Sequence, residues 1–185
     1  MELEFNKTNI NQVYKLFDAF NEVGPSLDDS IALKMRLNKS LLLITKLYLG
    51  LCTKAQNAME CFINASNPIS TKFIPQTFFE PVEALSKHPN KYYIVNPEHN
   101  PNFFKAKSFF VNRGKGLMQQ AIKVLVNFVN NAVCTVLASF NLFSGAVNVN
   151  DSSFSFIHHD ALYCIQIESD WDTEEDITKC INEIN

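Results

Sequence analysis

The sequence predicts an α+β protein that is mainly α-helical, with a three-helix core, a small antiparallel β-hairpin or sheet, and a C-terminal helix. Three observations predict this class. Apolar residues recur at three- and four-residue steps in stretches that begin near residue 9, at 27–63 and at 117–142. Glycine is scarce, with only 5 in the chain. Alternating apolar and polar residues, which indicate strands, are most evident near the C-terminus.

Length and composition favour one domain. The chain has 185 residues, of which 46% are hydrophobic, enough to bury one core, so we expect a single globular domain over 1–185. Within it we expect a helical part at 1–63, an irregular part rich in aromatic residues and proline at 64–116, a long helix at 117–142, and a hairpin with a C-terminal helix at 153–185. The formal net charge of -3 argues against a nucleic-acid partner.

The first predicted helix begins near Asn9 and ends at Gly24 and Pro25, because a single apolar stripe runs between these points. The second predicted helix runs from 27 to about 63. Ser26 and Asp29 have the spacing of a capping box at its start. Helices of this length need a partner along most of their surface, and the segment 117–142 is the expected one.

The region between these helices is less regular. We expect a short helix at 77–87 and a strand at 92–95, while 103–111 fits either a helix or a strand. Near the C-terminus, 153–157 and 162–167 alternate as strands and predict a hairpin. Thr173 is expected to cap a final helix at 174–184.

A small polar cluster stands between the last two predicted strands. Cys164, His158 and Asp160 are the only weak catalytic candidates, because thiol, imidazole and carboxylate also form nucleophilic and zinc sites. Their spacing fits neither chemistry, and adjacent histidines of a strand point to opposite faces. A polar turn is therefore favoured, and no catalytic residue, metal or cofactor is assigned.

Two features suggest binding. Arg113 and Lys115 stand with two glycines before the long helix, where backbone N–H groups and the helix dipole favour an anion. A loop-rich region with many large rings either covers the core or meets a partner. The candidate binding surface consists of the aromatic residues Phe78, Phe79, Tyr92, Tyr93, Phe103, Phe104, Phe109 and Phe110.

The five cysteines lack paired short spacing, and buried thiols in a reducing compartment are expected. The start of the chain is acidic and polar, which does not indicate a secretory signal peptide. We therefore expect a cytoplasmic protein, or one translocated into a host cell without a signal peptide.

The C-terminal tail combines an acidic cluster at 170–176 with Ile177, Ile181 and Ile184 near the end. This pattern resembles the translocation signals of type IV secretion effectors from intracellular bacteria. The resemblance covers about the last sixteen residues and implies no functional site. An acidic start to a capped helix explains the same residues through the helix dipole.

These observations favour a non-enzymatic module that binds a protein partner, such as a secreted effector or adaptor, through apolar and aromatic burial. Two alternatives remain open. One is a thiol-dependent transferase or hydrolase. The other is a membrane-associating protein that uses the apolar helix at 117–147, although its asparagines would be costly in lipid.

Overall fold

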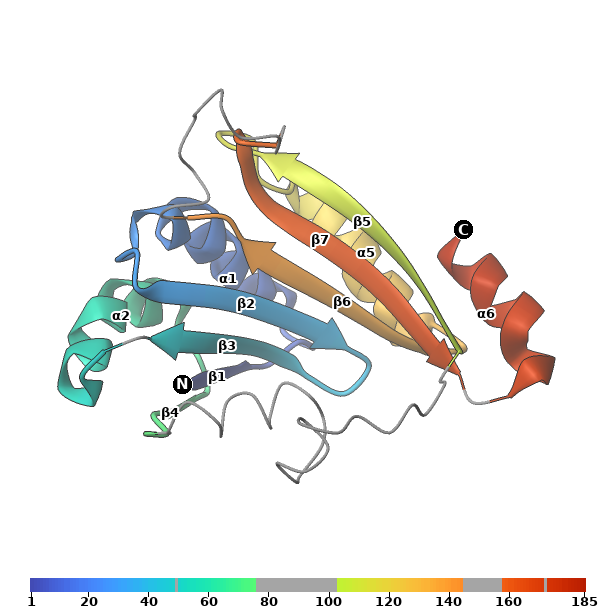
Figure 1. The fold of residues 1–185 in the computed structure, drawn as a ribbon, viewed down its shortest axis with the longest axis horizontal. Coiled ribbons are helices and arrows are strands. Elements are labelled where there is room, and N and C mark those ends of the chain that lie inside the picture. Colours follow the sequence, from blue (N-terminus) through green and yellow to red (C-terminus); the bar gives the residue numbers. More distant parts are fainter. Residues whose placement is uncertain (49, 76–102, 145–157, 172) are drawn as a thin grey trace, which may run out of the picture.

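The centre of the molecule is a seven-stranded sheet, seen in a computed structural model that describes residues 1–48, 50–75, 103–144, 158–171 and 173–185 (Figure 1). Neighbouring strands are antiparallel, in the order β4-β1-β3-β2-β6-β7-β5. The strands are β1 Glu2–Phe5, β2 Ile31–Asn38, β3 Leu42–Tyr48, β4 Ser70–Lys72, β5 Phe103–Asn112, β6 Thr135–Leu142 and β7 Ala161–Trp171. The helices are α1 Ile10–Glu22, α2 Cys52–Ser66, α5 Gln119–Asn131 and α6 Ile177–Ile184, with 3-10 turns at Gly24–Ser26 and Glu174–Asp176.

The order of the elements repeats once. A unit of strand, helix, two strands and helix runs from β1 to α2, and a second unit runs from β5 to α6. In each unit the third strand lies between the first and the second, and the units join where β2 pairs with β6. The closing helices are placed differently, because α2 packs on α1 whereas α6 packs on β7 and β5.

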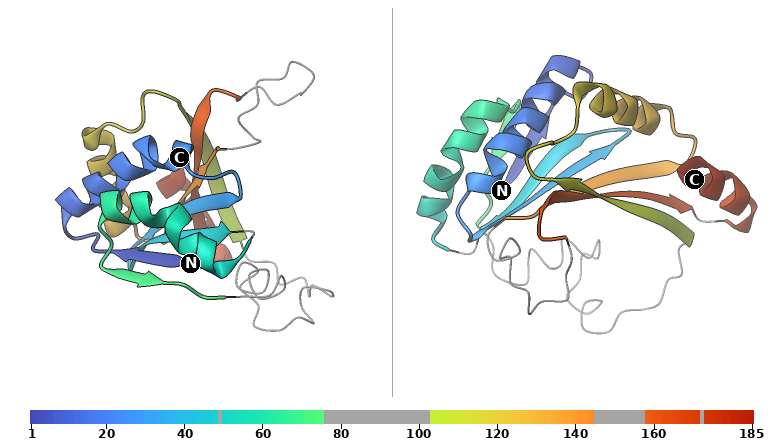
Figure 2. Two further views of the ribbon diagram at one scale, coloured as in Figure 1. Left: turned by 90° about the vertical axis from the view of Figure 1, so that its left-hand side faces the viewer. Right: turned by 90° about the horizontal axis from the view of Figure 1, so that it is seen from above.

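Three helices, α1, α2 and α5, cover one face of the sheet (Figure 2). Alternate strand residues point toward them and form the core, as Leu33, Met35 and Leu37 do on β2. A cluster of rings joins α1 to the centre of the sheet. Phe17 lies edge-on to Phe140, with ring centroids 5.2 Å apart, and Phe20 lies edge-on to Tyr163 at 5.3 Å.

The predicted three-helix core is wrong. The stretch predicted as one helix at 27–63 forms β2, β3 and then α2, and no helix starts at Ser26 and Asp29. The apolar residues of β2 alternate strictly, and Asn38 turns the chain into β3 by accepting hydrogen bonds from the N–H groups of Ser40 and Leu41, both at 2.8 Å. The sheet therefore replaces the expected helical bundle.

The long helix predicted at 117–142 is also wrong in its second half. α5 ends at Asn131, and the chain continues as β6, whose buried residues Val136, Ala138 and Phe140 alternate with others on the opposite face. No helix within the described parts of the chain is long and apolar enough to span a bilayer. The apolar helix at 117–147, on which the membrane-associating alternative rests, is therefore not formed over its described residues.

Other predictions are confirmed. α1 begins after Asn9, whose side chain accepts a hydrogen bond from the N–H of Gln12, and it ends before Gly24 and Pro25. The strand predicted at 162–167 lies within β7, and the C-terminal helix is present. The segment 103–111, which fitted either a helix or a strand, lies within the strand β5. The helix predicted at 77–87 and the strands at 92–95 and 153–157 fall outside the described residues.

The expectation of free thiols is wrong for two of the cysteines. Cys134, just before β6, forms a disulfide with Cys180 of α6. Cys61 and Cys164 are free, and Cys61 is exposed.

Candidate functional site

The sheet face opposite the helices carries polar and charged side chains from four of its seven strands, β2, β6, β7 and β5. No described helix covers this face, which we call the open face (Figure 2). The antiparallel register and the alternation of side chains assign its residues. They are Lys34, Arg36, Ser139, Asn141, Cys164, Gln166, Glu168, Ser108 and Phe110.

A polar row crosses all four strands at the middle of the open face. Arg36 lies opposite Ser139, Ser139 lies opposite Gln166, and Gln166 lies opposite Ser108. Directly opposed side chains of antiparallel strands start about 5 Å apart at Cβ. A guanidinium, two hydroxyls and an amide therefore lie side by side across the four strands.

One further cation, Lys34, and one carboxylate, Glu168, flank this row. Burial lowers the pKa of Lys34, the neighbouring Arg36 lowers it further, and Glu168 opposes this change. Arg36 Nε is buried and has no hydrogen-bond partner, and Ser139 is only 5% exposed. An unpaired buried donor is costly, and the half-buried guanidinium of Arg36 carries further N–H groups that can donate to a ligand oxygen.

Aromatic rings lie at the β5 side of the open face. The Phe110 ring stacks on the His158 imidazole with centroids 3.8 Å apart and planes 14° apart. Phe104, on the same face of β5, is 65% exposed. This edge can contribute stacking and apolar contact beside the polar row.

Cys164, one of the weak catalytic candidates, lies on β7, and His158 and Asp160 lie in the turn before it. Burial raises the pKa of Cys164, against the opposing effect of hydrogen bonds from Ser108 and the Phe109 backbone, so its thiol is not activated. His158 contacts the Phe110 ring, and the Asp160 carbonyl accepts the N–H of Arg113 at 2.8 Å. Among the described residues, no three His, Cys, Asp or Glu side chains gather as metal ligands.

The predicted binding residues are dispersed. Phe78, Phe79, Tyr92 and Tyr93 lie outside the described residues. Phe103 points to the helix-covered side and stacks on Trp171, with ring centroids 6.4 Å apart, whereas Phe104 lies on the open face.

The loop with Arg113 and Lys115 does not have the predicted geometry of an anion site. The Arg113 guanidinium donates to the carbonyl of Phe143 and so fastens the loop to the chain after β6. The helix begins only at Gln119, after Met118 as N-cap, and not directly after the glycines. The helix start therefore lies further from the glycines than expected, and the anion site itself stays a prediction.

The residues that make up the open face were missed by sequence reasoning, apart from Cys164, Phe104 and Phe110. The available signal was the alternation of polar residues with buried ones along 31–38, 135–142 and 161–171. Only the strand order brings these polar residues onto one face.

Comparison with known proteins shows a fold but no family. No protein-family model and no curated protein sequence matches the chain. Among solved structures it is similar to BBE-like #28 from Arabidopsis thaliana, with 18% identity and a TM-score of 0.84 over 99% of this chain and 40% of that one. A variant of berberine bridge enzyme in complex with (S)-reticuline is similar with 15% identity and a TM-score of 0.79, over 100% and 38% of the two chains.

A third similar structure is the xylooligosaccharide oxidase from Myceliophthora thermophila C1 in complex with xylobiose. It has 12% identity and a TM-score of 0.80, over 99% of this chain and 41% of that one. The chain thus spans about two fifths of the length of these structures. The sheet-rich fold of these structures contradicts the predicted helical bundle, while the effector role and the tail resemblance are not tested by fold and stay predictions.

Proposed function

We propose that this chain provides the substrate-facing sheet of an oxidase, with the open face as one wall of the substrate site. One observation carries the proposal: almost the whole chain shares its fold with a part of proteins described as oxidases or bridge enzymes, while its open face, which no described helix covers, presents a polar row with a buried, unpartnered Arg36 Nε. Arg36 and Lys34 would bind an oxygen of the substrate. Glu168 would accept a hydrogen bond from a substrate hydroxyl or amine.

The proposal requires a second protein body. The groups on the open face can bind, orient and exchange protons, but oxidation of an organic substrate also needs an electron acceptor, which a redox cofactor supplies. The polar groups of the face are spread over four strands and are not gathered at a phosphate cradle, so we assign the face to the substrate and not to the cofactor. The predicted protein partner thereby becomes a cofactor-carrying body opposite the open face.

The test is ligand binding to the intact chain. Xylobiose and (S)-reticuline are titrated separately, with saturation-transfer NMR as the readout and dissociation constants near the millimolar range expected for a one-walled site. Arg36→Met should raise the dissociation constant of the bound ligand at least tenfold. Lys123→Met, a loss of charge on the exposed side of α5, is the matched control and should have no effect.

Two results would contradict the proposal. One is the absence of binding of either ligand to the folded chain. The other is binding that Arg36→Met and Lys123→Met weaken equally, because the ligand would then sense net charge and not the open face.

A further inference from the structure

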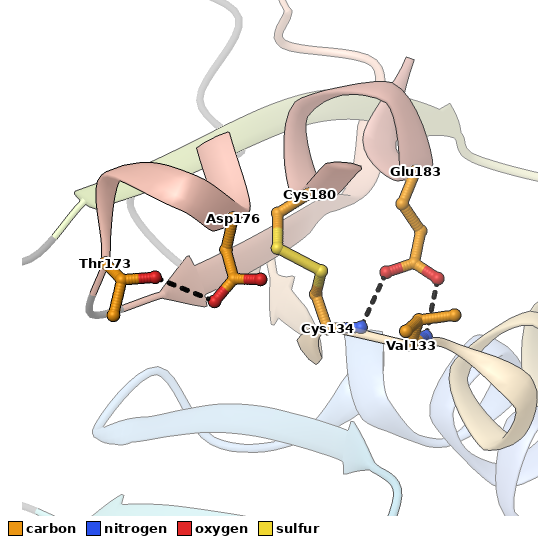
Figure 3. The surroundings of a disulfide bond; sticks show 6 residues. All are labelled: Val133, Cys134, Thr173, Asp176, Cys180 and Glu183. Atoms are coloured by element: carbon orange, nitrogen blue, oxygen red, sulfur yellow. Dashed lines mark hydrogen bonds between the residues drawn. A yellow bond between two sulfur atoms is a disulfide. The ribbon is translucent and has the colours of Figure 1, made fainter. Parts of the chain in front are cut away.

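The C-terminal helix α6 is fastened to the turn between α5 and β6 by a covalent and a polar anchor (Figure 3). The disulfide joins Cys180 to Cys134. Beside it, the Glu183 carboxylate accepts hydrogen bonds from the N–H groups of Val133 at 2.6 Å and of Cys134 at 2.9 Å. These two donors follow the end of α5 directly, so Glu183 satisfies backbone groups that the turn leaves free.

Apart from the hydrogen bonds to Glu183, the non-covalent interactions that keep α6 in place are weak. Of its eight residues only Cys180 and Ile184 are buried, at 2% and 8% exposure. Lys107 Nζ adds one exposed hydrogen bond to the Asn185 carbonyl at 3.1 Å. A helix of this length does not persist in water without tertiary contacts. The disulfide is therefore the main restraint on its position.

Two buried polar groups beneath α6 have no hydrogen-bond partner when the helix is in place. Thr135 pairs with Asp170, so Cys180, bonded to Cys134, lies at the same end of β7 as Ser169 and Trp171. Ser169 Oγ and Trp171 Nε1 are buried without a hydrogen-bond partner. Water could reach both groups if α6 moved away, which offsets part of the cost of detachment.

We propose that α6 is a redox-released strap, closed when Cys134 and Cys180 are bonded and open when both are thiols. This inference is independent of the proposed function. An external dithiol provides the electrons: its thiolate attacks the sulfur of half-exposed Cys134, and Cys180 leaves as a thiolate that takes up a proton. The second thiolate of the dithiol then attacks the mixed disulfide, releases Cys134 as a thiol after protonation, and closes the disulfide of the reductant.

Release of the strap removes one wall of an apolar groove between α5 and α6. Its floor is formed by Leu125 and Phe128 of α5 and by Ile167 of β7, and Ile184 and Glu183 of α6 line its other side. Oxidation returns Ile184 to this groove and re-forms the pair of hydrogen bonds to Glu183.

Hydrogen exchange measured by mass spectrometry tests the strap on the full chain, air-oxidised and after dithiothreitol. We expect exchange in 177–185 to accelerate at least tenfold on reduction, a smaller acceleration in 118–131, and no change in β2 and β6. Cys180→Ser should show the fast exchange without reductant. The control, Cys61→Ser with Cys164→Ser, should keep the full redox response.

Three outcomes would overturn the proposal. Peptide mapping of the oxidised chain could find no Cys134–Cys180 link. Residues 177–185 could stay equally protected after reduction and in Cys180→Ser. Reduction could also accelerate exchange in β2 and β6 as much as in α6, which would make the disulfide a staple of the whole fold and not of a strap.

Discussion

Lys46 is a charged side chain on the helix-covered face of the sheet, where its neighbours on alternate positions of β3 are apolar. It is only 3% exposed, and its Nζ donates to the Ala55 carbonyl of α2 at 3.1 Å and lies 5.0 Å from the ring centre of Tyr48. Burial lowers its pKa from 10.5 to about 8, although Asp28 acts in the opposite direction. Burial of this ammonium group therefore costs folding free energy.

The difference in the pKa of Lys46 between the folded and the unfolded chain sets the size and sign of its contribution to the free energy of unfolding. In full it corresponds to about 3.4 kcal/mol, at about 1.4 kcal/mol per pH unit. The contacts of Lys46 with the Tyr48 ring and the Ala55 carbonyl, together with residual hydration, reduce this cost. We expect a cost of about 1 to 2 kcal/mol, on the order of half the full value. Between pH 8 and 10.5 the unfolded chain binds more protons at Lys46 than the folded chain does. The free energy of unfolding therefore gains a contribution that rises with pH through this window.

The assay compares the wild-type chain with Lys46→Met in urea at pH 7, 8, 9 and 10. At pH 7 the variant should be more stable by about 1 kcal/mol, because methionine fills the same space without an ammonium group. Its advantage should shrink by roughly 1 to 2 kcal/mol as the pH approaches 10. A difference that stays constant across the series, or that grows with pH, would refute the reasoning, since other titrating groups are common to both chains.

Three further predictions test the core, the loop before α5 and the free thiols. Phe140→Ala, in the ring cluster between α1 and the sheet, should lower the free energy of unfolding in urea by about 3 to 5 kcal/mol. Gly116→Ala should cost about 2 to 3 kcal/mol and Gly114→Ala only about 1, because both have positive φ but only at Gly116 would a Cβ meet another side chain, at 2.5 Å; equal thermal shifts would contradict this. Iodoacetamide at pH 7.5 should alkylate exposed Cys61 well before Cys164, whose pKa burial raises, and faster labelling of Cys164 would revive the thiol-enzyme alternative.

Local signals were sufficient for α1 and for the C-terminal helix. The first has a side-chain cap at Asn9, one apolar stripe and a Gly-Pro stop, so no distant residue is needed to define it. The second has a strongly one-sided pattern after an acidic turn. Thr173, however, does not cap it as predicted, because its hydroxyl donates to the Asp176 carboxylate and accepts no backbone N–H.

The sheet was missed where two periodicities fitted the same residues. On β3 the inward-facing Lys46 breaks the apolar alternation that would have indicated a strand. Between α5 and β6 no glycine or proline marks the end of the helix. The turn is stabilised by Glu183, about fifty residues away in the sequence, whose carboxylate accepts both N–H groups of the turn. Such a tertiary interaction leaves no local sequence signal.

The candidate site was less predictable than the fold, because it depends on which strands become neighbours. Arg36, Ser139 and Gln166 come from distant parts of the sequence and meet only in the order β2-β6-β7. The pairing of Cys134 with Cys180, 46 residues apart, depends in the same way on α6 folding back to the start of β6.

The mirrored order of the two strand-helix units has a consequence for ancestry. Duplication and fusion of a half-length polypeptide produces such an arrangement, and that ancestor would have formed a twofold homodimer by pairing its second strand, antiparallel, with the same strand of another copy. Fusion then allows the two copies to diverge separately. On this account, the closing helix of the first copy, α2, came to pack on α1. The second copy acquired the cysteine that holds its closing helix, α6, beside β7 and β5.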